Sequence, residues 1–232
     1  TIAILLLVIF KLPETRPADT LTNRGLPFRQ YARILSDPRF ITFALVNAGA
    51  MGMALTYVSL APTVLMNVAG LSPLEFSIVF GANGFWIMAV SFVANRIIRK
   101  VGRPVCLKTG GILMFAGCLG LIAGITLVPP AEQTATWLYM LPVASACAGL
   151  AFLMGPATSY ALEPYSSEAG VASALVGSVQ MAGGAILGFI AMALPLQPKL
   201  SVALVMLAGG CLAMLARRAS KKSTGNLTRL ER

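Results

Sequence analysis

The sequence predicts an all-α, polytopic membrane protein whose main body is a bundle of six spanning helices. Three observations support this fold class: the composition, the recurrence of long apolar stretches, and the placement of basic residues between them. Hydrophobic residues make up 57% of the 232 residues and charged residues 11%, whereas a soluble domain has about 25% charged residues. The mean hydropathy is +0.80. We therefore expect lipid to be the main solvent of this chain.

Six apolar stretches are each predicted to cross the bilayer as one helix. Their positions are 40–66, 76–94, 105–128, 137–162, 169–194 and 200–216. A helix rises about 1.5 Å per residue, so about 20 residues cross a hydrocarbon core that is about 30 Å thick. The stretches are continuous rather than alternating, which favours helices over the strands of a membrane barrel.

Around these stretches the chain divides into four predicted segments. Residues 1–10 are apolar but too few to cross a bilayer, and we expect them to be the end of a preceding transmembrane helix. Residues 11–38 are polar and rich in proline, which predicts a cytoplasmic linker with a short interfacial helix at 28–35. Residues 39–216 form the predicted six-helix bundle, and residues 217–232 a basic cytoplasmic tail. On this division the chain is a fragment that starts inside a helix.

Basic residues indicate which ends of the spans face the cytoplasm. Seventeen of the 18 Lys and Arg residues lie within 11–39, 96–108 and 217–232, and the remaining one is Lys199. With six spans and a cytoplasmic start, all three groups lie inside, as the positive-inside rule requires. The loop 163–168 is an exception because it has no basic residue. The same rule accounts for the net charge of +10, so no nucleic-acid partner is expected.

Residue types that commonly carry enzyme chemistry are scarce. The sequence has no histidine, and its four cysteines lie in apolar stretches without CxxC spacing. We therefore expect no metal site, no cofactor and no enzymatic activity. All eight acidic residues lie in loops or at span ends. Because an intramembrane carboxylate is the usual proton carrier of a coupled transporter, any proton site is expected outside this chain.

Neutral polar and adaptable side chains inside the spans are the candidate substrate contacts. The candidates are Asn47, Met51, Asn83, Ser145, Phe152, Tyr160 and Gln180. Amides and hydroxyls can hydrogen-bond a substrate, and Met can repack around varied shapes. Small residues follow two stripes at helical spacing, one within 145–159 and one within 173–188. Each stripe is either a helix-packing surface or a cavity wall, and the sequence leaves both interpretations open.

Three short runs resemble one transporter family. The run LPET at 12–15 looks like the junction that follows the sixth helix of drug exporters of the major facilitator superfamily. The run RKVGR at 99–103 is similar to the C-terminal copy of the superfamily's loop motif. The runs ALEPY at 161–165 and AGVASAL at 169–175, with Gln180, resemble the junction of the tenth and eleventh helices in Bcr/CflA-type multidrug exporters.

This resemblance covers essentially the whole chain and implies the C-terminal half of a twelve-helix protein. It implies a bundle of two inverted three-helix repeats and a proton-driven exporter of drug-like or small organic compounds in the bacterial inner membrane. Its implied partners are the lipid bilayer, the missing N-terminal six-helix half, a small-molecule substrate and protons. Alternating access by rocking of the two halves is the implied mechanism. Two alternatives stay open: an exporter of one metabolite, such as a sugar or amino acid, and a six-helix scaffold without transport.

The loops at the predicted cytoplasmic side supply the candidate gating residues. They are Arg99, Lys100, Gly102, Arg103, Glu163 and Glu168. Where the loop motif has an aspartate this chain has Arg99, so a carboxylate latch is not expected in that loop. Glu168 either caps the helix that follows it or forms a gating ion pair with Arg99, Lys100 or Arg103.

Overall fold

The computed structural model describes residues 28–230, with side chains described through residue 218. Helices account for its regular structure, and no strand occurs in that range. The elements are α2 (Phe28–Leu35), α3 (Pro38–Pro62), η1 (Thr63–Val68), α4 (Pro73–Val101), α5 (Arg103–Thr126), α6 (Thr136–Leu162), η2 (Glu163–Glu168), α7 (Ala169–Ala193) and α8 (Pro198–Leu230). The predicted helix end at 1–10 and most of the linker lie outside the described residues. The short helix predicted at 28–35 is observed as α2.

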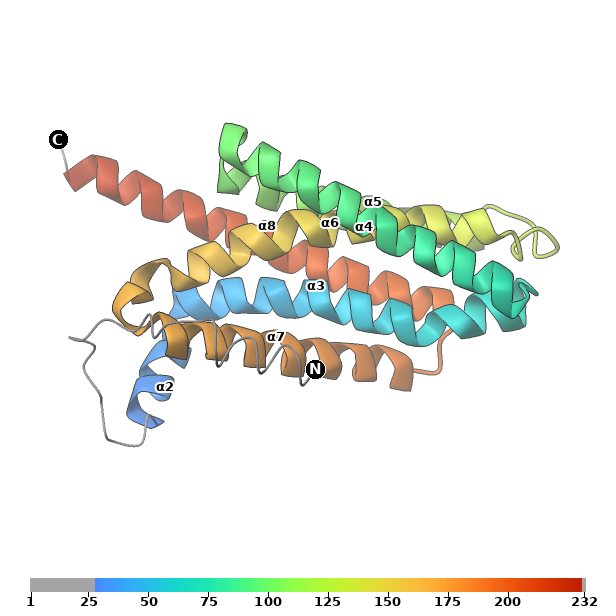
Figure 1. Ribbon diagram of the computed structural model, residues 1–232, viewed down its shortest axis with the longest axis horizontal. Helices are drawn as coiled ribbons and strands as arrows, with labels where there is room; N and C mark the ends of the chain where they lie inside the picture. The colour runs from blue at the N-terminus through green and yellow to red at the C-terminus, as the bar shows by residue number, and fades with distance from the viewer. Residues whose placement is uncertain (1–27, 231–232) are drawn as a thin grey trace, which may run out of the picture.

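Six helices, α3 to α8, are each long enough to cross a bilayer. Five continuous segments within the described range are apolar enough to do so, and one of them, Thr136–Ala193, has 58 residues. A straight helix of that length would extend about 87 Å, far beyond one crossing. It contains α6 and α7, which fold back on each other through the 3₁₀ turn η2 (Figure 1). The predicted all-α polytopic fold with six spans is confirmed, and α8 continues as a helix into the predicted basic tail as far as Leu230.

Helix α3 occupies the centre of the bundle and α4 its edge. In Figure 1, α3 lies between α7 on one side and α6 and α8 on the other, and its contacts are with all three. Helix α5 packs between α6 and α8, whereas α4 packs mainly on α6. The core is therefore built around α3 and the α5–α6 pair.

The helices alternate in direction, so the loops gather at two ends (Figure 1). One end, which we call the basic end, has the start of α3, the α4–α5 turn, η2 and the exit of α8. The opposite end has the segments 69–72, 127–135 and 194–197. The α4–α5 turn is abrupt because Gly102 adopts φ +82°, a left-handed conformation that favours glycine.

The opposite end of α3 changes from an α-helix to a π-helix directly after a proline. Pro62 has no backbone N–H, so the carbonyl four residues earlier loses its donor. The chain continues as η1, and the N–H of Ala69 donates to the carbonyl of Val64, five residues earlier, at 3.0 Å. A widened turn of this kind re-aims the end of a spanning helix without breaking it.

Glycines bring the backbones of neighbouring helices close together. A Cβ on Gly110 in α5 would lie 2.8 Å from the carbonyl oxygen of Gly149 in α6, and a Cβ on Gly49 in α3 would lie 3.0 Å from the Cα of Gly209 in α8. Such close approach increases dispersion contacts between helices where lipid offers no hydrophobic driving force. Gly149 belongs to the predicted 145–159 stripe, so this part of the stripe is a packing surface.

Candidate transport site and ion-pair cluster

The first candidate substrate contacts lie on α3, where it faces α6 and α7. Asn47 is fully buried, and its amide nitrogen donates to the hydroxyl of Thr158 on α6 at 2.9 Å. Its amide oxygen has no hydrogen-bond partner in the described structure. Met51, one turn further along α3, is half-buried and lies against Gly184 of α7. This part of α3 therefore carries an unused acceptor next to an adaptable apolar side chain.

A second polar group lies where α3, α4 and α6 meet. Asn83 on α4 donates from its amide nitrogen to the sulfur of Cys147 on α6 at 3.4 Å. Tyr57 stacks on Phe80 with ring centroids 5.5 Å apart, and the rings of Tyr57 and Tyr139 lie 6.4 Å apart. The Asn83 amide oxygen and both tyrosine hydroxyls are buried without a partner among the described residues. Unsatisfied polar atoms are costly in an apolar environment, so these groups are available to a polar ligand or water.

Three other candidates on α6 point elsewhere. Ser145 donates to the carbonyl of Leu113 on α5 at 3.0 Å, and Phe152 packs in a small cluster with α4 and α5 side chains such as Val90 and Cys106. Tyr160 lies near the basic end. The seven candidates therefore do not form one pocket within this chain.

The glycine-containing stripe on α7 divides into two parts. A Cβ on Gly184 would lie 3.0 Å from the backbone nitrogen of Gly52, and one on Gly188 would lie 3.0 Å from the Thr56 hydroxyl, so this part packs on α3. A Cβ on Gly177 would meet nothing within 4 Å. Gln180, between the two parts, is half-buried, and no hydrogen bond of its amide is found within the described range. The part of the stripe at Gly184 and Gly188 is therefore a packing surface, and the cavity-wall interpretation stays a prediction for the part around Gly177.

Sequence reasoning missed Thr158, Tyr57 and Tyr139. Tyr57 could have been found, because a tyrosine inside a span departs from the usual placement of tyrosines at membrane interfaces. Tyr139 lies in the first turn of α6, so in the sequence it looks like an ordinary interfacial residue. In the sequence nothing distinguishes Thr158 from a small packing residue. Only the fold shows that it lies opposite Asn47.

At the basic end, Glu163 joins three elements through two arginines. It forms ion pairs with Arg39 of α3 and with Arg103 of α5, the latter at 2.8 Å. Arg103 also donates to the hydroxyl of Ser159 at 3.0 Å, and its guanidinium carbon lies 4.1 Å from the ring centre of Tyr160. The side chain of Arg103 is thus held by a carboxylate, a hydroxyl and an aromatic face at once.

The linker helix α2 is tied to the same end by two further contacts. Arg33 of α2 forms an ion pair with Glu168, the residue that precedes α7. Just after α2, Asp37 accepts a hydrogen bond from the hydroxyl of Tyr165 at 2.5 Å and another from the backbone N–H of Arg39 at 2.8 Å. Asp37 therefore caps α3 and holds η2 with one carboxylate.

These contacts give the partners of the predicted gating residues in the conformation described. Of the three proposed partners, Arg103 pairs with Glu163, whereas no ion pair of Arg99 or Lys100 is found in the described part of the chain. Glu168 pairs with Arg33 rather than with the α4–α5 turn, and its side chain makes no capping hydrogen bond to α7. Helix α2 contacts α7, and this brings Arg33 to the carboxylate of Glu168.

The ion pairs shift the proton affinities of the groups at the basic end. Arg103 and, to a smaller extent, Arg39 hold the pKa of Glu163 below its usual value. Hydrogen bonding to Arg33 lowers the pKa of Glu168 and raises that of Arg33. Burial and the neighbouring Asp37 carboxylate raise the pKa of Tyr165 to about 12. At neutral pH the carboxylates are therefore charged and Tyr165 remains a hydrogen-bond donor.

The arrangement of these residues is suited to binding a solute and to movement of the helices. Within residues 28–230 no group of three or more His, Cys, Asp or Glu side chains could hold a metal ion. The buried amides and hydroxyls can hydrogen-bond a neutral or cationic solute. The ion pairs join separate helices, so they would break if the helices moved apart.

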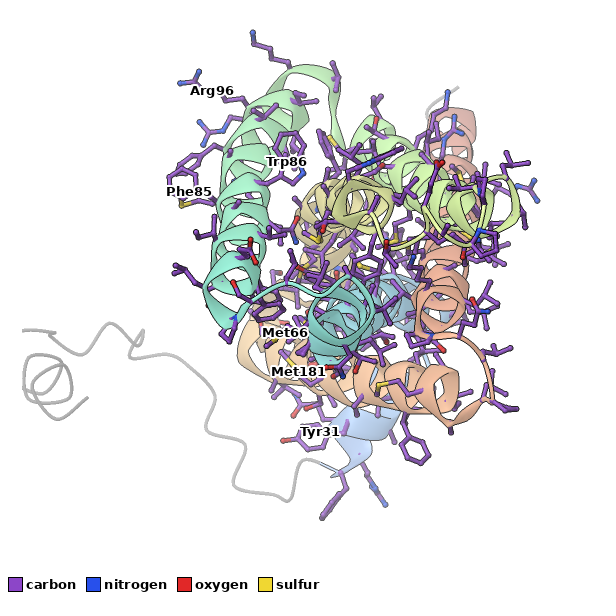
Figure 2. The ribbon with its side chains drawn as sticks, turned by 90° about the vertical axis from the view of Figure 1, so that its right-hand side faces the viewer. Tyr31, Met66, Phe85, Trp86, Arg96 and Met181 are labelled. Atoms are coloured by element: carbon purple, nitrogen blue, oxygen red, sulfur yellow. The ribbon has the colours of Figure 1, made fainter. Side chains whose placement is uncertain are left out.

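The outer face of α4 is apolar and uncovered. Figure 2 shows Phe85 pointing away from the bundle and Trp86 turned toward α6, where its indole N–H donates to the carbonyl of Ala144 at 2.9 Å. A Cβ added to Gly81 or Gly84 of α4 would meet nothing within 4 Å. Two open glycines on a spanning helix leave room for another backbone to approach closely.

Comparisons with known proteins agree with this architecture. A family model described as Major Facilitator Superfamily matches residues 1–188. The multidrug resistance protein MdtL of Escherichia coli O17:K52:H18 and that of Escherichia coli O127:H6 are each 31% identical over 186 residues. The MdtL of Shigella boydii serotype 18 is 30% identical over the same length. Each alignment covers 80% of this chain and 44% of the relative, so the chain spans less than half the length of these relatives.

Proposed function

Because the chain belongs to the major facilitator superfamily, a family of transporters rather than enzymes, we propose that it is the C-terminal half of a proton-coupled exporter of drug-like or small organic compounds. The observation that carries this proposal is the alignment with proteins named for multidrug resistance, which covers 80% of the chain and 44% of each relative. Transport would proceed by alternating access, with this bundle rocking against an N-terminal half.

The proposed orientation places the basic end in the cytoplasm of a bacterial cell, at the inner membrane. Arg39, Arg96, Arg99, Lys100 and Arg103 all lie at that end of the bundle. Basic residues are retained on the cytoplasmic side during insertion. The linker and the C-terminal tail would then both be cytoplasmic.

The N-terminal half would cover the open faces of α4 and α7. Gly81 and Gly84 on α4, and Gly170 and Gly177 on α7, have open space where a Cβ would be. Phe85 and Phe189 on the same two helices are 71% and 70% exposed, respectively. A second helical bundle can approach closely along such surfaces.

The substrate would lie between the halves and use the polar groups that the bundle leaves unsatisfied. We assign the contacts of this half to Asn47, Met51, Asn83 and Gln180, with the hydroxyls of Tyr57 and Tyr139 near Asn83. Each of these polar groups carries an atom without a partner in the described chain.

The candidates whose side chains are already engaged receive a different role. Ser145 and Phe152 stabilise the packing of α6 on α5 and α4, and Tyr160 supports the guanidinium of Arg103. We therefore propose these three as structural residues in the conformation described.

Gating would consist of separating the ion pairs at the basic end. Glu163 with its two arginines, and Glu168 with Arg33, hold α2, α3, α5 and η2 together. Gly102 would act as the pivot of the α4–α5 turn. The proton would be carried by an acid in the other half, because the spans of this chain carry no Asp or Glu in their middle portions.

Efflux by the full-length protein tests the substrate assignment. We expect Gln180→Ala to reduce the efflux of at least one cationic dye, because the substrate loses an amide partner. Ser178→Ala is the matched control, since the Ser178 hydroxyl already donates to the carbonyl of Ala174 on the same helix at 2.9 Å. Unchanged efflux of every compound in Gln180→Ala would contradict the assignment. Efflux restricted to one sugar or amino acid would instead support a specific metabolite exporter.

A further inference from the structure

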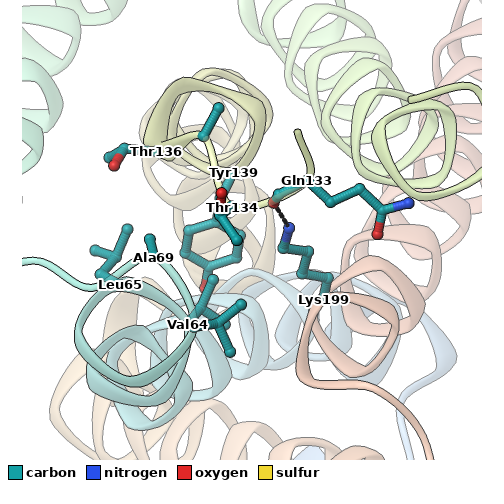
Figure 3. A pocket seen from close by; sticks show the side chains of 10 residues that line it. Val64, Leu65, Ala69, Gln133, Thr134, Thr136, Tyr139 and Lys199 are labelled. Carbon is teal, nitrogen blue, oxygen red and sulfur yellow. Dashed lines mark hydrogen bonds between the residues drawn. The ribbon is translucent and has the colours of Figure 1, made fainter. Parts of the chain in front are cut away.

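A cavity of about 240 Å³ lies at the opposite end of the bundle, away from the ion-pair cluster. It is lined by residues of η1, of the segment between α5 and α6, and of the turn into α8. They are Val64, Val68, Pro130, Gln133, Thr134, Gln197, Pro198 and Lys199. Figure 3 shows its inner continuation, where Tyr139 and Val64 lie near the centre of the view and Lys199 and Gln133 lie at one side. That inner part has no room for a water molecule, so a ligand would occupy the outer part.

Lys199 is an exception to the charge distribution of the whole sequence. The other 17 basic residues lie in the groups assigned to the cytoplasmic side. Lys199 is half-buried, its ammonium donates to the backbone carbonyl of Gln133 at 2.6 Å, and none of the ion pairs in the described chain includes it. An ammonium has three N–H donors, so two of them remain for another acceptor.

The groups around Lys199 are held in place by the chain itself. The Gln133 amide nitrogen donates to the carbonyls of Ile125 and Val128, both at 2.9 Å, which fixes the loop that presents the Gln133 carbonyl. Helix α8 begins at Pro198, so Lys199 lies in its first turn. The N-terminus of a helix carries partial positive charge and adds to the attraction of the ammonium for an anion.

Four of the eight residues that line the cavity are apolar, and Thr134 and Gln197 add polar groups to its wall. Val64 and Val68 come from η1, Pro130 comes from the loop before α6, and Pro198 is the first residue of α8. The volume is below the roughly 300–1,000 Å³ of typical drug-sized sites. A fitting ligand therefore has one anionic group at Lys199 and a small apolar body against the valines and prolines.

We propose that this cavity binds a small organic anion, with Lys199 as the counter-ion of its carboxylate or phosphate group. Occupancy would brace the π-helical end of α3 against the loops on either side of it. The anion is either a soluble molecule or the headgroup of an anionic phospholipid, since both present a negatively charged group to the ammonium. The site goes beyond the proposed export function and does not depend on it.

The test uses the full-length protein with its lysines reductively methylated with ¹³C, a modification that keeps their charge. The Lys199 signal is assigned by its loss in Lys199→Gln. Benzoate is titrated in zwitterionic micelles, and separately the protein is placed in nanodiscs with and without phosphatidylglycerol. Lys108, which is exposed in α5 near the basic end, is the matched control.

We expect a saturable shift of the Lys199 signal, with half-saturation by benzoate at about 1 mM or below, and no shift of Lys108. A response to benzoate supports a soluble ligand, and a response to phosphatidylglycerol alone supports a lipid headgroup. No response of Lys199 to either probe, or an equal and unsaturable response of Lys108, would overturn the proposal. The test does not measure efflux, so neither outcome supports or contradicts the export proposal.

Discussion

Helices α3 and α4 are neighbours in the chain and similar in hydropathy, but they occupy opposite environments. The most apolar part of α3 has a mean hydropathy of 1.5 and is 61% buried, whereas that of α4 reaches 1.8 and is 11% buried. The more apolar helix is thus the less buried one. Hydropathy measures transfer from water, and lipid satisfies an apolar side chain as well as a protein core does.

What separates the two helices is where they carry small and polar side chains. Helix α3 presents Asn47, Gly49, Gly52 and Thr56 to its neighbours, and all four are buried. Helix α4 buries few residues and directs large side chains such as Phe85 and Phe92 outward. In a membrane bundle, close backbone approach and interhelical hydrogen bonds therefore identify the core better than hydrophobicity does.

The largest expected difference between α3 and α4 is in their response to the replacement of a glycine by valine. In Gly49→Val a Cβ would lie 3.0 Å from the backbone of Gly209, so α3 and α8 must separate. We expect a loss of roughly 1–3 kcal/mol of folding free energy, seen as a lower melting temperature and a lower yield in detergent. Gly84→Val on α4 meets open space in this bundle and should fold with a normal yield but lose efflux, because it obstructs the proposed contact with the other half. Equal melting temperatures for the two variants would refute the distinction.

The buried amides provide a second, smaller contrast. Asn47→Ala removes a hydrogen bond to Thr158 and should cost roughly 0.5–1.5 kcal/mol, whereas Asn83→Ala removes a weaker contact to a thiol and should cost less. A double-mutant cycle of Asn47→Ala with Thr158→Val, followed by thermal unfolding, isolates the pair. A coupling energy of zero would show that the bond contributes nothing.

At the basic end the contrast concerns one arginine from each helix. Arg39→Gln removes an ion pair to Glu163 and should cost at most about 1 kcal/mol, while making cysteines at the basic end more accessible to labelling. Arg99→Gln on α4 removes no ion pair found in the described chain. It should change neither the folding free energy nor the accessibility of cysteines to labelling. Identical labelling of the two variants would argue against the proposed gate.

The smallest expected effect is a dependence on pH. Because Arg103 and Arg39 lower the pKa of Glu163, its ion pairs stabilise the fold above the unfolded value of about 4.5. That contribution is lost as the pH falls through the lower folded value. The melting temperature of Glu163→Gln should therefore be below wild type at about pH 7 and converge with it once the pH falls below the lowered pKa of Glu163. Glu132→Gln, in the exposed loop before α6, is the control and should follow wild type throughout.

Much of the fold could be predicted from the sequence because it depends on local properties. The spans were located by apolar length, and α2 was located by its position between prolines. The candidate substrate contacts remain predictions. Asn47, Asn83 and Gln180 do carry unused polar groups, but Ser145 and Phe152 face α5 and α4, and periodicity along one helix gives no direction toward a particular neighbour. Similarly, Glu168 could be recognised as a candidate for pairing, but its partner Arg33 lies 135 residues away in the chain.

The sequence by itself determined that this is a six-span membrane protein of the major facilitator superfamily with one strongly basic end. Hydropathy and charge act residue by residue through transfer to lipid and retention at the cytoplasmic surface, so they can be read along the chain. Only the tertiary structure decided that α3 is central and α4 peripheral, which arginine pairs with which acid, and that Lys199 lies at the edge of a cavity. These features depend on how side chains from segments far apart in the sequence pack against one another at distances of a few ångströms.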